Sequence, residues 1–130
     1  MSAPDSKSLH LLCIDSRTLV GEALRKILIN AGYTVSHAED LDSARRLAST
    51  EWDHIDVVIS DHDVPPGSAL DVLEHLKNAG YRGRAIVYSG GLSAKQRAQY
   101  STGLLDALVE KKDESARLLS IMKAFHHEPP

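Results

Sequence analysis

The chain has 130 residues, a formal net charge of −3 and a single cysteine, Cys13. Its length is typical of one domain, and its charges of both signs form no basic stripe, so we expect no nucleic-acid partner for this chain. No segment approaches the ~20 apolar residues of a membrane span or the apolar core of a secretion signal. We therefore expect a soluble, cytoplasmic protein without membrane contact, with one domain at residues 8–127 and disordered tails at residues 1–7 and 128–130.

Short, continuously apolar runs alternate with longer amphipathic stretches along the whole chain. The short runs predict five strands, at residues 9–14, 33–38, 55–60, 85–88 and 107–109. The longer stretches carry apolar residues at helical spacing and predict five helices, at residues 19–31, 41–49, 70–79, 94–102 and 116–125. Gly32 and Gly80 stand where a helix can end in left-handed backbone, and Ser93 with Gln96 forms a capping box. The alternation predicts an α/β fold with a doubly wound, five-stranded parallel sheet.

Polar residues follow four of the predicted strands. Asp15 follows the first strand, Asp61 the third, Ser89 the fourth and Lys111 the fifth, and Asp63 lies two residues beyond Asp61. In an open parallel sheet with strand order 2-1-3-4-5, ligands bind beyond the carboxyl ends of the strands, between the first and the third. We therefore expect these carboxylates, the hydroxyl and the ammonium to converge at one edge of the sheet.

Carboxylates that lie this close together repel each other unless a cation joins them. Mg²⁺ suits such a site because it prefers oxygen ligands and needs only one or two carboxylates, which leaves room for a phosphoryl group. We expect Mg²⁺ to bind Asp15, Asp61 and Asp63, the last through its backbone carbonyl or its side chain. Asp61 would then attack phosphorus, while Mg²⁺ and Lys111 offset charge on the phosphoryl oxygens and Ser89 donates a hydrogen bond.

Three motifs resemble the receiver domain of two-component response regulators, and the likeness extends over about residues 9–125. Residues 56–70 resemble the phosphoacceptor strand and loop of that family, including a proline four residues after Asp61. Residues 86–90 resemble the fourth strand with its Ser/Thr switch residue, and residues 108–111 resemble the fifth strand with its lysine.

This resemblance implies a flavodoxin-like (βα)5 receiver fold and a signalling role. Asp61 would receive a phosphoryl group from a sensor histidine kinase or a phosphotransfer protein, with Mg²⁺ as cofactor. The face that binds a downstream protein would then change. The likeness implies a phosphorylatable switch and not a turnover enzyme, and it allows a homodimer through the fourth and fifth helices.

The sequence departs from the family at two positions of the site and at one register. Ser16 stands where the family usually has a second acidic residue that touches the metal, so we expect Ser16 to be a weak ligand and Mg²⁺ affinity to be reduced, although Asp63 could compensate. Leu108 stands at the usual aromatic switch position, so no hydroxyl-coupled aromatic flip is expected there. One extra residue before Lys111 leaves Glu110 as a weaker alternative for the lysine position.

The fourth helix is the expected site of conformational readout. It is short and mostly polar, and Ala94, Ala98 and Tyr100 are its few residues suited to packing. Few buried contacts make local rearrangement cheap. We therefore predict that phosphorylation of Asp61 draws Ser89 inward and reshapes residues 89–102.

Two other functions remain open from the sequence. A receiver-like adaptor that binds partners without phosphorylation is compatible with Ser16 and Leu108. A haloacid-dehalogenase-like phosphatase is a more distant alternative, because Asp61-His62-Asp63-Val64 resembles the nucleophile motif of those enzymes, with Asp63 as acid/base. Against the phosphatase, Asp15 lies upstream of the motif and no suitable acid follows Lys111.

Overall fold

A five-stranded parallel sheet forms the centre of the molecule. The structure is a computed structural model that describes residues 9–15, 19–89, 92–100, 105–110 and 119–124. The strands are β1 (His10–Ile14), β2 (Thr34–Ala38), β3 (Val57–Ser60), β6 (Arg84–Ser89) and β7 (Ala107–Glu110). Their order is β2-β1-β3-β6-β7, and all neighbours pair in parallel. The predicted α/β fold and its strand order 2-1-3-4-5 are therefore confirmed.

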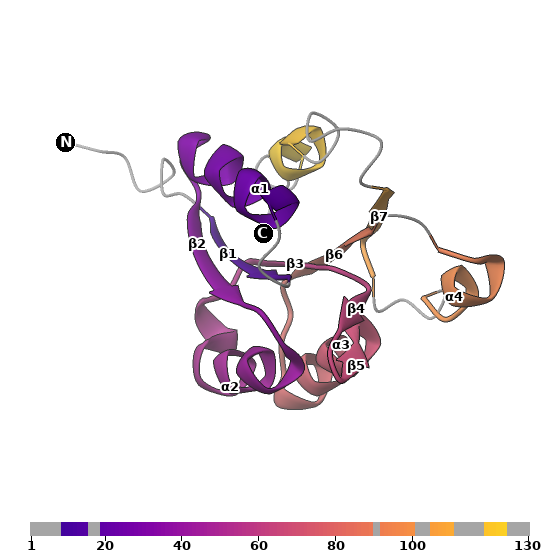
Figure 1. Cartoon of the computed structure of the whole chain (residues 1–130). Coiled ribbons are helices and arrows are strands. Elements are labelled where there is room, and N and C mark those ends of the chain that lie inside the picture. Colours follow the sequence, from indigo (N-terminus) through magenta and orange to yellow (C-terminus); the bar gives the residue numbers. More distant parts are fainter. Residues whose placement is uncertain (1–8, 16–18, 90–91, 101–104, 111–118, 125–130) are drawn as a thin grey trace.

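Helices cover both faces of this sheet (Figure 1). Helix α1 (Leu19–Asn30) and the helical residues 119–124 lie on one face, and α2 (Leu41–Glu51) and α3 (Ala69–Ala79) lie on the other. The short helix α4 (Ala94–Ala98) lies beyond the β7 edge, and none of its own residues is buried.

Burial on both faces explains why the strands are continuously apolar. In β1, Leu11 and Cys13 pack with α1, whereas Leu12 and Ile14 pack with α2 and α3. All four side chains are at most 1% exposed. A strand that alternates between two cores needs apolar residues at every position.

The predicted helix ends are confirmed at several positions. Gly32 and Gly80 have φ values of 101° and 103°, in the left-handed region that glycine adopts without strain. Ser93 and Gln96 form the expected capping box at α4. No helix of the described part of the chain is long and apolar enough to cross a membrane.

Two small elements were not anticipated. A 3-10 helix (Trp52–His54) follows α2, and a two-stranded hairpin joins β4 (Asp63–Val64) to β5 (Gly67–Ser68) through the cis peptide bond Pro65–Pro66. The hairpin follows the end of β3 directly. It is a separate two-stranded sheet that follows the carboxyl end of β3, where the predicted site lies.

Candidate functional site

The structure brings Asp15 and Asp61 to the same edge of the sheet. They follow the neighbouring parallel strands β1 and β3, and the Asp61 backbone N–H donates to the Ile14 carbonyl at 2.9 Å. Both residues line a small cavity of about 10 Å³, which is roughly the space that one water molecule requires. Asp61 is half-buried, whereas Asp15 is 7% exposed. The predicted meeting of these two carboxyl residues at the switch point is observed.

The cavity is otherwise mostly apolar. Its remaining lining comes from β1, β3, β6 and α1, namely Cys13, Ile14, Gly21, Leu24, Ile59, Ser60 and Tyr88. Burial, with a smaller contribution from the charge of Asp15, raises the pKa of the Cys13 thiol to about 12. Cys13 is 1% exposed and belongs to the core that packs against α1.

Ser60 fixes the backbone of Asp61 and was not singled out from the sequence. It is buried, and its hydroxyl donates to the backbone carbonyl of Asp61 at 2.8 Å. The only sequence signal was a serine at the end of an apolar strand. A serine hydroxyl can bond to nearby backbone at such a position, as Ser60 does to the next residue.

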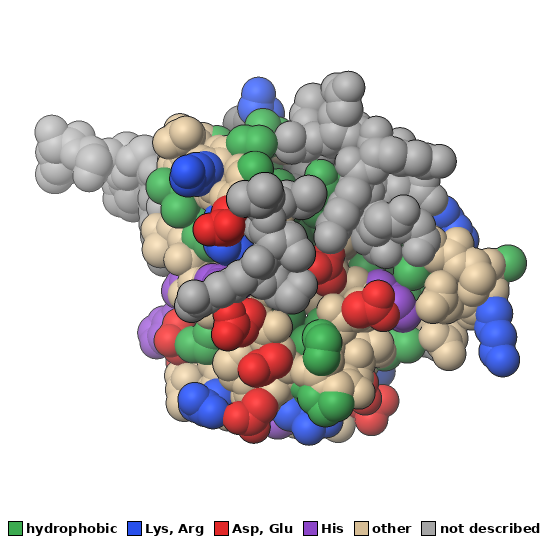
Figure 2. All heavy atoms as spheres, in the orientation of Figure 1, with side chains coloured by type: hydrophobic (Ala, Val, Ile, Leu, Met, Phe, Trp, Pro, Cys, Tyr) green, Lys and Arg blue, Asp and Glu red, His purple; other side chains and the backbone are tan. Residues whose placement is uncertain are grey.

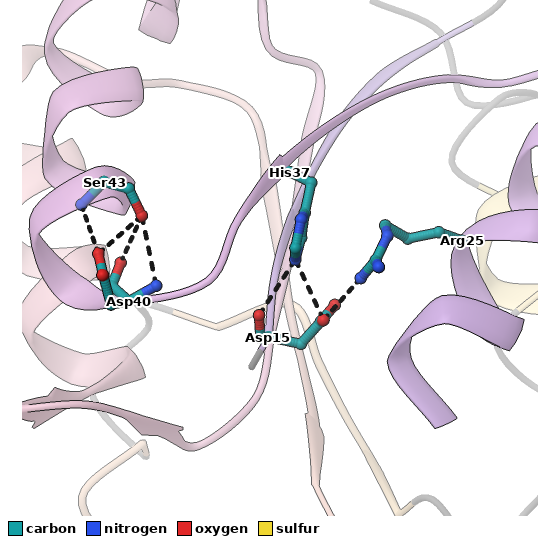
Figure 3. Close-up of polar contacts among 5 residues, drawn as sticks. All are labelled: Asp15, Arg25, His37, Asp40 and Ser43. Carbon is teal, nitrogen blue, oxygen red and sulfur yellow. Dashed lines mark hydrogen bonds and ion pairs between the residues drawn. The ribbon is translucent and has the colours of Figure 1, made fainter. Parts of the chain in front are cut away.

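The Asp15 carboxylate is held by two basic side chains (Figure 3). Nη1 of Arg25, on α1, lies 2.6 Å from Asp15 Oδ1, and Nε2 of His37, on β2, lies 3.2 Å from the same oxygen. The His37 nitrogen is also 3.1 Å from the Asp15 backbone carbonyl. Neither basic residue was expected at the site. The Arg25 guanidinium, which is always protonated, offsets the negative charge of Asp15 beside Asp61.

The Asp63 side chain does not join the other two carboxylates in the cavity. It is exposed on the β4–β5 hairpin, where Asp63 pairs with Ser68. Among the residues that the structure describes, no group of three or more Asp, Glu, His or Cys side chains is arranged to hold a metal ion. A role for the Asp63 backbone carbonyl in metal binding stays a prediction.

The remaining predicted site residues can be placed only in part. Ser89 and Glu110 are Cα partners in the register of β6 and β7, so these strands end side by side. The side chains of both lie outside the described residues, as do Ser16 and Lys111. Their roles stay predictions.

A buried histidine and a buried tyrosine connect the segment after β3 to the turn that follows α4. His62 follows Asp61 and is 8% exposed, and its Nδ1 lies 2.5 Å from the hydroxyl of Tyr100, which is 6% exposed. The two rings meet edge to face, and the amide nitrogen of Gln96 lies 3.4 Å from His62 Nε2. Burial and, secondarily, the charge of Asp63 raise the pKa of Tyr100 to about 12, so its hydroxyl keeps its proton at neutral pH.

Tyr100 also packs near Leu108, which stands where the family resemblance would place an aromatic switch residue. It belongs to a cluster with Val87 of β6, and Leu108 of β7 packs against the same cluster. The sequence indicated Tyr100 only as a packing residue of the fourth helix. Its hydroxyl contact with His62 depends on a tertiary approach that no spacing rule encodes.

The outer face carries mainly acidic side chains around this edge. Figure 2 shows acidic side chains over the α2 and α3 side of the molecule, and basic side chains over α1, along the lower edge and on α4.

A model of the response regulator receiver domain family matches residues 11–123, which is most of the chain. None of the curated protein sequences compared with the chain matches it.

Solved structures with the same fold match almost the whole chain. A CheY-like receiver domain protein from Methanospirillum hungatei has a TM-score of 0.83 at 19% identity, over 92% of this chain and 94% of that one. The N-terminal domain of an uncharacterized protein from Wolinella succinogenes has a TM-score of 0.80 at 27% identity, over 92% and 95%. A response regulator from Thermotoga maritima in complex with Mg²⁺-BeF has a TM-score of 0.75 at 22% identity, over 90% and 98%.

Proposed function

This chain belongs to the response regulator receiver domain family, and we propose that it is a phosphorylatable switch whose acceptor is Asp61. The observation that carries the proposal is the place of Asp61 at the carboxyl end of β3, where it lines one cavity with Asp15. In an open parallel sheet this is the switch point at which ligands bind. The donor would be a sensor histidine kinase or a phosphotransfer protein.

In the proposed reaction an Asp61 carboxylate oxygen forms a bond to phosphorus, and the bond from phosphorus to the donor nitrogen breaks. The Asp61 backbone N–H donates to the carbonyl of Ile14, and the Asp61 backbone carbonyl accepts from the hydroxyl of Ser60. These two hydrogen bonds restrict the acceptor residue and keep its position constant while the phosphoryl group approaches.

Receiver domains bind Mg²⁺ at the phosphorylation site, and the Thermotoga maritima regulator was solved with Mg²⁺-BeF. The donors of this chain fit that ion in kind, because Asp15 and Asp61 are carboxylates at one cavity and Mg²⁺ needs only one or two. Asp61, Asp15 and the Asp63 carbonyl would hold it, with Ser16 as a weak ligand. When bound, Mg²⁺ would neutralise charge on the transferring phosphoryl oxygens.

Ser89 and Lys111 complete the proposed site. The Ser89 hydroxyl would donate to one phosphoryl oxygen, and the Lys111 ammonium would form an ion pair with another. The parallel register of β6 and β7 supports both roles, because the two strands end beside each other.

The readout is proposed to involve residues 89–102. The His62–Tyr100 hydrogen bond supports this, because it connects the residue next to the acceptor with the segment that follows α4. The absence of buried residues within α4 itself makes its movement cheap. A downstream protein, or a second copy of the chain, would read the altered face. The exchange of signals with a kinase implies a cytoplasmic setting.

The adaptor that works without phosphorylation is the second candidate, and one observation favours it. Asp15 Oδ1 is paired with Arg25 and with His37, and these partners would compete with a metal for that oxygen. The phosphatase alternative gains no such support, because receiver domains are generally signalling switches and not turnover enzymes.

Intact-mass spectrometry after incubation with acetyl phosphate separates the first two candidates. The wild-type chain, Asp61→Asn and a control, Asp53→Asn, would each be incubated with and without Mg²⁺. Asp53 is exposed within the 3-10 helix and does not line the cavity. We expect wild type and the control to gain one phosphoryl group and Asp61→Asn to gain none. No gain in wild type under any condition would favour the adaptor.

A further inference from the structure

The Asp15 carboxylate is enclosed more tightly than a metal ligand at an open site would be. Its side chain is 9% exposed, and Arg25, which pairs with it, is 16% exposed. A Cβ atom built on Gly21 would lie 2.5 Å from Asp15 Oδ1 and 3.3 Å from Oδ2. The carboxylate therefore packs against bare backbone of α1.

Gly21 and Arg25 together form the site that holds the Asp15 carboxylate. They lie four residues apart on α1, so they occupy the same face of the helix. Gly21 leaves the space that the carboxylate fills, and Arg25 reaches the carboxylate from the next turn at 2.6 Å. His37 closes the other side from β2 (Figure 3).

The charges at this edge need a cation. Asp15 and Asp61 line one cavity. Two negative charges that lie close together and away from bulk water repel each other. The guanidinium of Arg25 is always protonated and supplies one positive charge without any metal. A divalent ion that is to bind Asp15 Oδ1 must compete with it.

We infer that Arg25 is the resident cation beside the cavity that Asp15 and Asp61 line, and that it lowers the affinity of the chain for divalent metals by holding Asp15. This deepens the proposed function, on which it depends for the place of the metal. Arg25 is thereby a residue that sets metal affinity through Asp15 and contacts no phosphoryl group. Both the metal-free and the metal-bound cavity are then charge-compensated.

The test is to titrate the phosphoryl-free chain with two divalent ions. Binding of Mg²⁺ is measured by isothermal titration calorimetry, and binding of Mn²⁺ by the electron paramagnetic resonance signal of the free ion. The variants are Arg25→Gln and a matched control, Arg46→Gln. Arg46 also pairs with a carboxylate, Asp42, at 2.8 Å, but on the exposed surface of α2.

We expect Arg25→Gln to raise the affinity for both ions by about tenfold or more, since a buried charge pair competes far more strongly than an exposed one. Arg46→Gln should leave it within about twofold of wild type. Unchanged affinity in Arg25→Gln would overturn the inference. Weaker binding would overturn it as well, because Arg25 would then orient Asp15 for the metal.

A second measurement covers the case in which Arg25→Gln does not fold. The guanidinium ¹⁵N resonances of Arg25 in the wild-type chain should shift as Mg²⁺ is added, because the ion pair with Asp15 is released. Resonances that do not move while the metal binds would contradict the inference. Neither readout uses a phosphoryl donor, so a chain that accepts no phosphoryl group can still pass this test, and a functional receiver can fail it.

Discussion

Replacing Tyr100 with phenylalanine tests whether the buried contact between the acceptor loop and the end of α4 contributes to stability. The change keeps the ring, and with it the packing against Val87 and Leu108, and removes only the hydroxyl that lies 2.5 Å from His62 Nδ1. His62 is 8% exposed, so its nitrogen would lose a partner at a place where water has little access. Leaving a buried polar atom unsatisfied costs about 1–3 kcal/mol.

For a domain of this size, each kcal/mol lowers Tm by roughly 3–5 °C. We would measure the free energy of unfolding by urea titration at pH 7, followed by circular dichroism. Tyr33→Phe is the matched control, because Tyr33 is half-buried but its hydroxyl has no hydrogen-bond partner among the residues that the structure describes. If Tyr100→Phe is no less stable than Tyr33→Phe, the His62–Tyr100 hydrogen bond does not contribute as described.

Three other predictions follow from the geometry. Gly21→Ala should destabilise the chain by about 1–3 kcal/mol in urea titration, because the new Cβ would lie 2.5 Å from Asp15 Oδ1; alanine favours a helix over glycine by about 1 kcal/mol, so a gain in stability would refute this close approach. The pKa of Cys13 is raised from 9.0 to about 12, which lowers the thiolate fraction at pH 8. A disulfide reagent should therefore react with the folded chain about a thousandfold more slowly than with the urea-unfolded chain. Equal rates in the two states would show an accessible thiol. Beryllofluoride should change the amide hydrogen exchange of residues 89–102 while leaving that of β1 unchanged, and equal protection in both states would count against the proposed readout.

The sequence predicted the sheet because the apolar pattern of each strand reflects its surroundings. Strands such as Val57–Ser60 are buried on both faces, and a continuous apolar run reports that directly. The meeting of Asp15 and Asp61 followed from the same pattern, since strand ends in a parallel sheet share one edge. The β4–β5 hairpin escaped prediction because each of its strands has two residues, which is too short for any periodicity.

The partners of Asp15 could not be predicted in the same way. Arg25 lies on the polar part of an amphipathic helix, where most basic residues face solvent, and only the fold turns it toward β1. One signal was present in the sequence. Gly21 interrupts the helix four residues earlier, at a position where glycine is unfavourable, which indicates a close approach by another group.

The contact between His62 and Tyr100 was hidden for a related reason. The sequence separates them by 38 residues, and neither lies in a motif that demands the other. The one sequence signal was Leu108 at the aromatic switch position. Leucine does not supply the aromatic ring expected there, and the ring of Tyr100 packs in the same cluster instead.

The central claim is that Asp61 carries the phosphoryl group, and locating that group tests it most directly. The chain would be incubated with acetyl phosphate and Mg²⁺, reduced with borohydride, which converts an aspartyl phosphate to homoserine, and then digested and mapped by tandem mass spectrometry. We predict homoserine at position 61 and unmodified aspartate at positions 15 and 63. Homoserine at another aspartate, with Asp61 intact, would contradict the assignment of the acceptor.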